Sequence, residues 1–199
     1  MENKNKVSKI LLVQGSPRKN GNSIALANQI VKGAELVGAI AEKIYLHDKD
    51  ISPCQACYAC QQPDGNGCAI DDEMQPIYKK LIDIDCWIIA SPVYWFTMSA
   101  QTKLFMDRCF FALLGYKKEA FAGKRIAIAM SYGDTDAFNS GCVNALRTFQ
   151  DAFRYVGANI VGMVYGSAEE PGEIKSNQPL MDQAEALGKK LAGKQMNSH

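Results

Sequence analysis

The stretch KILLVQGSPRKNGNS, residues 9–23, decides the fold, because an apolar run gives way there to small polar residues around one arginine. Residues 9–14 have the branched apolar composition of a buried β-strand, and residues 22–38 place apolar side chains on one face of a helix. The loop between them therefore lies at a helix N-terminus, where backbone N–H groups and the helix dipole favour an anion.

This loop matches neither of two familiar nucleotide-binding loops. A triphosphate loop reads GxxxxGK[ST], but Gly15 and Gly21 are one residue too far apart and Asn22 stands in place of the lysine. The dinucleotide loop GxGxxG needs a further glycine. The remaining polar side chains suit a single terminal phosphate, with the arginine as its cation: Ser16, Arg18, Asn20, Asn22 and Ser23. The alternative is a polar turn before an ordinary helix capped by Asn22 or Ser23.

Further along the chain, apolar strands alternate with helices. Strands are predicted at 41–48, at the start of 86–96, at 125–133 and at 159–167, and helices at about 99–114, 137–156 and 179–193. This alternation predicts one doubly wound α/β domain over residues 1–199, with a five-stranded parallel sheet and helices on both faces. Segment 49–72 breaks the pattern and is expected to be a cysteine-rich loop insertion.

Two more loops are expected at the same edge of the sheet as the first. Segment SPVYWFTMSAQTK, residues 91–103, carries three successive aromatic residues, which cannot all face one core. At least one ring should be exposed or cover a planar ligand, although a subunit interface also favours such residues. Segment SYGDTDAFNSG, residues 131–141, follows the fourth strand. Since parallel strands end at one edge, the three loops predict one binding site.

The charge balance excludes some kinds of partner. Lysine and arginine number 22 and acidic residues 21, which gives no electrostatic case for nucleic acid or an anionic membrane. No apolar run approaches the roughly 20 residues of a membrane span, and the first ten residues lack the apolar segment of a secretory signal. We therefore expect a cytoplasmic protein, in which seven cysteines suggest metal or redox chemistry more than disulfides.

Four of the cysteines lie in the insertion with the spacing Cx₂Cx₂Cx₇C: Cys54, Cys57, Cys60 and Cys68. This spacing lets one short segment surround a metal centre, and four thiolates suit a [4Fe–4S] cluster. Zinc held by four thiolates and a set of reduced thiols without metal are the alternatives. The other three cysteines are interpreted as small buried hydrophobic residues.

Taken together, GSPRKNGNS, CQACYACQQPDGNGCAIDDE and SPVYWFTMSAQTKLFMDR resemble the NAD(P)H-dependent FMN reductase family of flavodoxin-like proteins, and most closely its iron–sulfur flavoprotein branch. The resemblance runs from about residue 8 to 170. It implies strand order 2-1-3-4-5, FMN at the carboxyl edge, one [4Fe–4S] cluster on the four cysteines, and a homodimer or homotetramer.

The resemblance also implies a role for each candidate site residue. The residues expected to hold the FMN phosphate are Ser16, Arg18, Asn20, Asn22 and Ser23. Those expected to border the isoalloxazine ring are Pro92, Val93, Tyr94, Trp95 and Phe96, with Ser131, Tyr132 and Gly133 on its other side.

These observations predict an FMN-dependent oxidoreductase. It would move electrons from NAD(P)H or a ferredoxin-type donor to a quinone, nitro compound, free flavin or other acceptor. No Ser/His/Asp set or paired-carboxylate site stands out, which suits chemistry carried by the cofactor. A non-enzymatic FMN electron carrier and a zinc-stabilised binding module without flavin are the alternatives. By resemblance, electron-carrying flavodoxins are strongly acidic, so this near-neutral chain favours a reductase.

Overall fold

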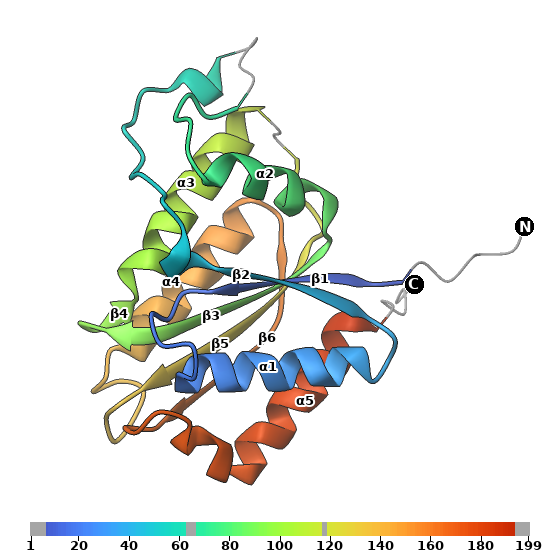
Figure 1. The fold of residues 1–199 in the computed structure, drawn as a ribbon, viewed down its shortest axis with the longest axis vertical. Helices are drawn as coiled ribbons and strands as arrows, with labels where there is room; N and C mark the ends of the chain where they lie inside the picture. Colours follow the sequence, from blue (N-terminus) through green and yellow to red (C-terminus); the bar gives the residue numbers. More distant parts are fainter. Residues whose placement is uncertain (1–6, 63–66, 117–118, 194–199) are drawn as a thin grey trace, which may run out of the picture.

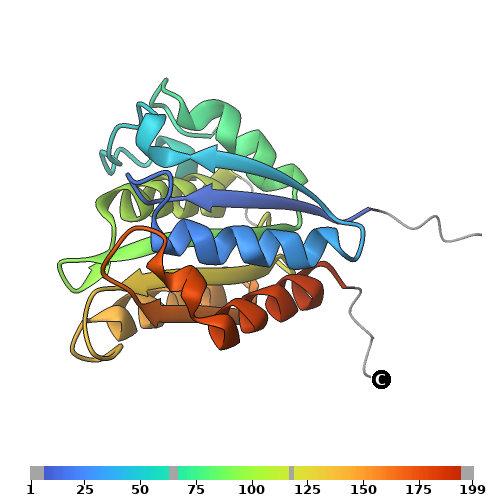
Figure 2. The same cartoon turned by 60° about the horizontal axis from the view of Figure 1, so that its bottom comes forward.

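A parallel sheet forms the centre of the structure, a computed structural model that describes residues 7–62, 67–116 and 119–193. The parallel strands are β1 (Lys9–Gln14), β2 (Ile40–Tyr45), β3 (Cys86–Tyr94), β5 (Arg125–Tyr132) and β6 (Asn159–Ser167). They pair in the order β2-β1-β3-β5-β6, and all end at the same edge (Figures 1 and 2). Counted without the short strand β4, this is the predicted order 2-1-3-4-5, so the predicted fold is confirmed.

Helices cover both faces of the sheet, as Figure 1 shows. One face carries α1 (Asn22–Glu35) and α5 (Gln178–Ala192), and the other α2 (Met74–Asp83), α3 (Ala100–Tyr116) and α4 (Cys142–Tyr155). Short 3₁₀ turns lie at η1 (Leu46–Asp48), η2 (Ala59–Gln61) and η3 (Glu173–Ser176). Within the described ranges, none of the helices combines the length and apolar character that crossing a membrane requires.

The central strands explain why the sheet holds together. In β1 the side chains of Ile10 and Leu12 pack toward α1 and α5, and those of Leu11 and Val13 pack toward the helices of the other face. All four side chains are fully buried. Successive residues of a strand point to opposite faces, so a strand covered on both faces needs a continuous apolar run.

Three local features differ from the prediction. The strand predicted at 41–48 ends at Tyr45, and Leu46–Asp48 form a 3₁₀ turn. Segment 137–156 becomes helical only at Cys142, because Asp136 accepts two following backbone N–H groups at 2.7 and 2.9 Å and Gly141 takes a left-handed φ of 76°. The short strand β4 (Thr97–Met98) pairs antiparallel with the end of β3 and was not predicted. Strands β3 and β4 thus form a β-hairpin with the aromatic segment at its turn.

Helices α1 and α5 cross in close contact at two glycines. A Cβ atom at Gly33 would lie 2.0 Å from the carbonyl oxygen of Glu185, and one at Gly188 would lie 1.8 Å from that of Ile30. Any larger side chain would push the helices apart, because the atoms in the way belong to the backbone.

We expect Gly188→Ala to lower the free energy of unfolding by about 1–3 kcal/mol, since the added methyl group overpacks this crossing. Urea denaturation measures the change. Gln183→Ala, at an exposed position of α5, is the matched control and should change the value by less than about 0.5 kcal/mol. Equal stabilities of the two variants would contradict the close-crossing argument.

Candidate functional site

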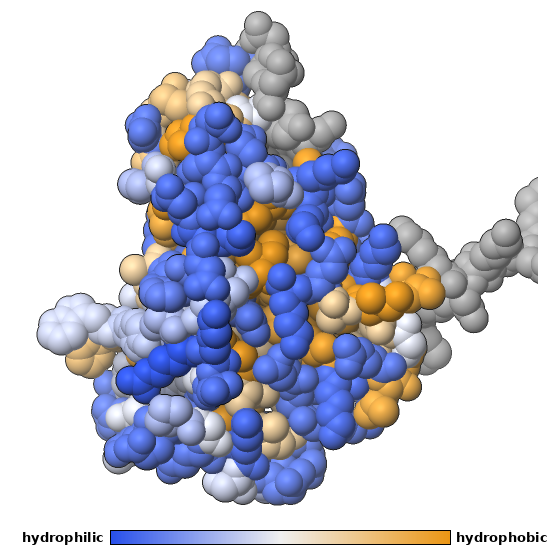
Figure 3. All heavy atoms as spheres, in the orientation of Figure 1, coloured by the Kyte–Doolittle hydropathy of each residue, from blue (hydrophilic) through white to orange (hydrophobic). Residues whose placement is uncertain are grey.

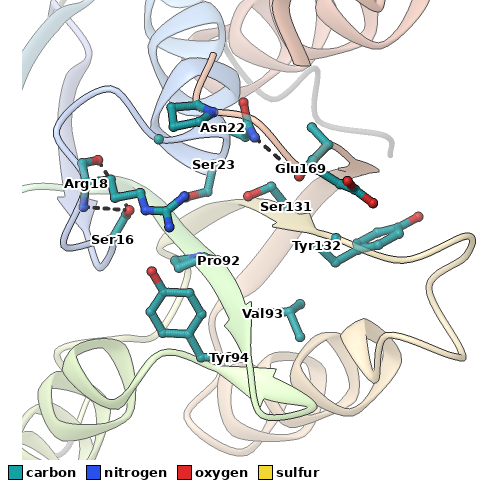
Figure 4. A pocket seen from close by; sticks show the side chains of 14 residues that line it. Ser16, Arg18, Asn22, Ser23, Pro92, Val93, Tyr94, Ser131, Tyr132 and Glu169 are labelled. Carbon is teal, nitrogen blue, oxygen red and sulfur yellow. Dashed lines mark hydrogen bonds between the residues drawn. The ribbon is translucent and has the colours of Figure 1, made fainter. Parts of the chain in front are cut away.

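A cavity of about 300 Å³ opens at the carboxyl edge of the sheet (Figure 4). The structure brings together most of the predicted site residues in its wall: Ser16, Arg18, Asn22, Ser23, Pro92, Val93, Tyr94, Ser131, Tyr132 and Gly133. Of the predicted set, Asn20, Trp95 and Phe96 are not among the lining residues. Gly21, Ala168, Glu169 and Pro171 line the cavity and were not predicted.

The loop after β1 folds back on itself through Ser16. The Ser16 hydroxyl accepts the N–H of Arg18 at 3.1 Å and donates to the carbonyl oxygen of the same residue at 3.3 Å. The N–H of Gly21 donates to that carbonyl oxygen as well, at 2.9 Å. From β2, the Tyr45 hydroxyl donates to the carbonyl oxygen of Pro17 at 2.6 Å. These bonds fix the loop that leads into α1.

The first turn of α1 has the features of an anion site. Ser23 is 1% exposed, and its hydroxyl has no hydrogen-bond partner among the described residues, although it belongs to a residue that lines the cavity. The first N–H groups of a helix also lack partners within the helix. Figure 4 shows the exposed Arg18 side chain extending over the cavity toward Ser23. A cation, an unpaired hydroxyl and a helix N-terminus thus face one point.

Asn22 connects this helix to a distant loop instead of capping it. Its amide nitrogen donates to the carbonyl oxygens of Ala168 at 3.4 Å and Glu170 at 2.9 Å. Its amide oxygen accepts the N–H groups of Gly172 at 2.8 Å and Ile174 at 3.3 Å. The expectation that Asn22 or Ser23 caps α1 is wrong, because the cap residue is Gly21 and no side chain bonds there. Asn22 therefore fixes the wall contributed by the chain after β6.

The aromatic segment forms the exposed tip of the β3–β4 hairpin, which projects from the body of the protein (Figures 1 and 3). Trp95 and Phe96 have left-handed φ values of 49° and 66°, which bulky residues rarely adopt. The Trp95 side chain is 91% exposed, as the sequence predicted for at least one ring. The Asn144 amide donates to the carbonyl oxygen of Phe96 at 3.1 Å and holds the tip against α4.

Beside the first cavity, the hairpin borders a second one of about 230 Å³. Val93, Tyr132 and Gly133 line both cavities, and Trp95 and Phe96 line only the second. The predicted aromatic residues thus divide between two adjoining spaces. A flat molecule lying in the second space would contact whatever fills the first.

The four cysteines of the insertion lie around a separate, small hollow. Cys54, Cys57, Cys60 and Cys68 line it, and its volume is about 10 Å³, close to the space of one water molecule. All seven cysteines of the chain are thiols, and burial raises the pKa of the Cys60 thiol. Within residues 7–62, 67–116 and 119–193, no group of three or more His, Cys, Asp and Glu side chains is arranged to hold a metal ion.

A buried ion pair supports the wall of this hollow. Arg108 of α3 donates from Nη1 to Asp72 Oδ2 at 2.6 Å and from Nη2 to Oδ1 at 3.0 Å, and the two side chains are 0% and 7% exposed. Arg108 Nη1 also donates to the carbonyl oxygen of Ser52 at 2.6 Å. Burial alone would raise the pKa of Asp72, but Arg108 and the N–H groups of Ser52 and Met74 hold it below its ordinary value.

A doubly wound parallel sheet, with an anion site after β1 and an aromatic hairpin after β3, defines a protein of the flavodoxin-like class. The chain belongs to the NADPH-dependent FMN reductase family, whose sequence profile matches residues 8–171. The predicted enzyme class, an NAD(P)H-dependent and FMN-dependent oxidoreductase, is thereby confirmed.

Individual relatives agree with this assignment. An iron-sulfur flavoprotein of Methanocaldococcus jannaschii is 31% identical over 92% of this chain and 95% of its own. An NAD(P)H:quinone oxidoreductase from Methanothermobacter marburgensis has a TM-score of 0.70 at 14% identity, over 95% of this chain and 99% of its own. Megasphaera elsdenii flavodoxin has a TM-score of 0.59 at 16% identity, over 92% of this chain and 98% of the flavodoxin. The last two likenesses concern the fold alone.

Asp72→Asn should lower the free energy of unfolding at pH 7 by about 3–5 kcal/mol, because it leaves the buried Arg108 charge without its counterion. The pKa of Asp72 is lower in the folded state than in the unfolded state. Its contribution to the free energy of unfolding is therefore fully present above the unfolded-state pKa of about 3.9, and it is lost as the pH falls through the folded-state pKa. Urea unfolding at successively lower pH should therefore bring wild type and variant together. Asp151→Asn, in an exposed pair, is the control, and a difference that does not depend on pH would contradict this account.

Proposed function

We propose that the cavity at the carboxyl edge binds FMN, with the phosphate at the first turn of α1 and the isoalloxazine ring between the hairpin after β3 and the loop after β5. One observation carries the proposal: the buried Ser23 hydroxyl lacks a partner beside the Arg18 cation and the N-terminus of α1. An unpaired buried hydroxyl is costly, and a phosphate oxygen would satisfy it.

The lining of the rest of the cavity suits a planar ring. Pro92, Val93 and Tyr94 offer one surface and Tyr132 another, and the two surfaces come from adjacent parallel strands. A Cβ atom at Gly133 would meet nothing within 4 Å, so this position leaves open space where a larger residue would protrude. Trp95 and Phe96 are proposed to border the ring from the adjoining cavity, where the nicotinamide of NAD(P)H or a quinone, nitro compound or free flavin has room to lie.

When bound, FMN supplies the hydride and electron chemistry. The chain binds the cofactor and orients it. Arg18 and Ser23 fix the phosphate end, the Ser16 hydrogen bonds keep their loop in shape, and Asn22 holds the wall made by residues 168–171. Each of these roles is one of binding or positioning, so no side chain is required to form a covalent bond with the substrate.

We further propose that the four cysteines of the insertion hold one [4Fe–4S] cluster, which would accept single electrons from the flavin or a ferredoxin-type partner. The proposal is supported by the donor chemistry of four thiols around one hollow and by the likeness to iron-sulfur flavoproteins. The hollow of about 10 Å³ has to widen for a cluster to bind, because it has room for little more than a water molecule.

The exposed aromatic side chains suggest how copies of the chain associate. Trp95, Phe96 and Phe138 are 91%, 55% and 80% exposed, and large aromatic residues favour protein interfaces. We propose that they lie between subunits of a homodimer or homotetramer. We also propose that residues 1–199 form one flavodoxin-like domain. We propose that the enzyme is cytoplasmic.

Replacing Arg18 tests the phosphate assignment. We expect Arg18→Ala to weaken FMN binding about 10- to 100-fold, the effect of removing a charged hydrogen bond. Riboflavin has no phosphate, so its affinity should not change. Calorimetry with both flavins measures the two affinities. Lys19→Ala is the matched control, because the Lys19 side chain pairs with Asp48 at 3.3 Å. Equal losses for FMN and riboflavin would refute the phosphate role of Arg18.

Metal analysis tests the cysteine assignment. Anaerobically purified protein should contain about four iron and four sulfide per chain, together with FMN. Cys68→Ala should remove most of the iron and keep the flavin. Cys142→Ala is the control, because Cys142 lies in α4 outside the hollow and should leave both contents unchanged. Flavin without iron, or zinc in place of iron, would show that the cysteine assignment is wrong.

A further inference from the structure

We infer that Arg108 is a functional part of the cysteine site: its Nε–H donates a hydrogen bond to a sulfur atom of the cluster and raises the cluster's reduction potential. This inference rests on the proposed function, in which the four cysteines hold a [4Fe–4S] cluster. It concerns a residue of α3, far along the chain from the cysteines, that neither their spacing nor the comparisons indicate.

Arg108 lies at the hollow although it comes from a different element. It lines the hollow together with the four cysteines, and its side chain is 0% exposed. Helix α3 packs against η2, the short turn that contains Cys60. An arginine is nearly always charged, so the chain keeps a positive charge buried beside four thiols.

Hydrogen bonding leaves one donor of this guanidinium without a partner. Nη1 and Nη2 both donate to Asp72, and Nη1 donates also to the carbonyl oxygen of Ser52. Asp72 thus holds the group by its Nη edge. Nε is buried and has no partner among the described residues. A buried unpaired donor is destabilising, and its persistence needs an explanation such as an acceptor bound there.

The neighbouring tyrosine does not supply that acceptor. The Tyr78 hydroxyl donates to the carbonyl oxygen of Arg108 at 3.2 Å, and it interacts with both Arg108 and Cys68. This bond uses the hydroxyl proton and not the oxygen lone pairs, but Nε has no hydrogen-bond partner among the described residues, so the Tyr78 oxygen does not satisfy it. Gln55 and Tyr58 line the hollow as well as the four cysteines. The cysteine sulfur atoms, or the sulfide of a cluster bound to them, are the acceptors that the proposal assigns to Nε.

Such a hydrogen bond favours the reduced cluster. Each electron that the cluster accepts adds a negative charge, and no bond forms or breaks in the transfer. The electron comes from the flavin, which NAD(P)H reduces. A donor N–H and a fixed positive charge stabilise the more negative state, so they raise the reduction potential. Asp72 keeps the guanidinium in place and so acts as a positioning residue.

A redox titration tests the role of Arg108. We would load the full chain anaerobically with iron and sulfide, confirm its FMN content, and titrate it with dithionite while recording the reduced cluster by electron paramagnetic resonance. Arg108→Lys keeps a positive charge beside Asp72 but lacks Nε. The double variant Arg108→Gln with Asp72→Asn leaves no unpaired buried charge, which protects against failure to fold. Arg147→Lys, exposed on α4, is the matched control.

We expect both Arg108 variants to bind iron and FMN but to show a reduction equilibrium constant about tenfold lower, which is a potential about 59 mV lower for a one-electron couple. The control should keep the wild-type potential. Iron-loaded variants with the wild-type potential would overturn the assignment of Arg108 and leave the cluster proposal intact. A wild-type protein that takes up no iron would overturn both.

Discussion

The parallel pairing of β1 with β3 is the constraint on which the site depends. The N–H of Gly15 continues that pairing by donating to the carbonyl oxygen of Ala90 at 2.8 Å, so the loop after β1 starts beside the hairpin that follows β3. The Ser99 hydroxyl then donates to the carbonyl oxygen of Gly15 at 2.7 Å and lies 2.9 Å from the Thr102 hydroxyl. A Cβ atom at Gly15 would lie 1.9 Å from that hydroxyl, so only glycine permits this contact. These buried contacts therefore set the spacing between the loop after β1 and the aromatic hairpin.

Two arginines, one exposed and one buried, lie in different surroundings in this molecule. Arg18 is exposed over the main cavity and faces solvent until an anion binds. Arg108 is buried and already paired with Asp72, and the pair links the insertion to α3. An exposed arginine recognises a ligand at little cost to stability, whereas a buried one must be balanced by the fold itself. In the proposed function the first receives a cofactor that binds from outside, whereas the second links the cysteine segment to α3.

Much of the fold was predictable because β1, β3 and β5 are buried on both faces of the sheet, and such strands consist of continuous runs of apolar residues. Because these strands end at one edge, the sequence alone predicts that Arg18, Tyr94 and Tyr132 lie around one site, and all three line the cavity. The two-residue strand β4 was too short to leave a periodic signal. The cavity wall at Glu169 depends on contacts made across about 150 residues, which local patterns do not carry. The ion pair of Arg108 with Asp72 joins residues 36 apart in the chain, so local sequence patterns do not carry it either.

The contacts of Asn22 also bear on the order in which the protein can be assembled. Its amide at the start of α1 is hydrogen-bonded to residues 168–174, which a ribosome makes after β6, the last of the described strands. A growing chain that stops before this segment has the loop after β1 and the aromatic hairpin but not the wall that residues 168–171 add to the cavity. The cavity is thus completed late in synthesis, only after β6 and the loop beyond it have been made.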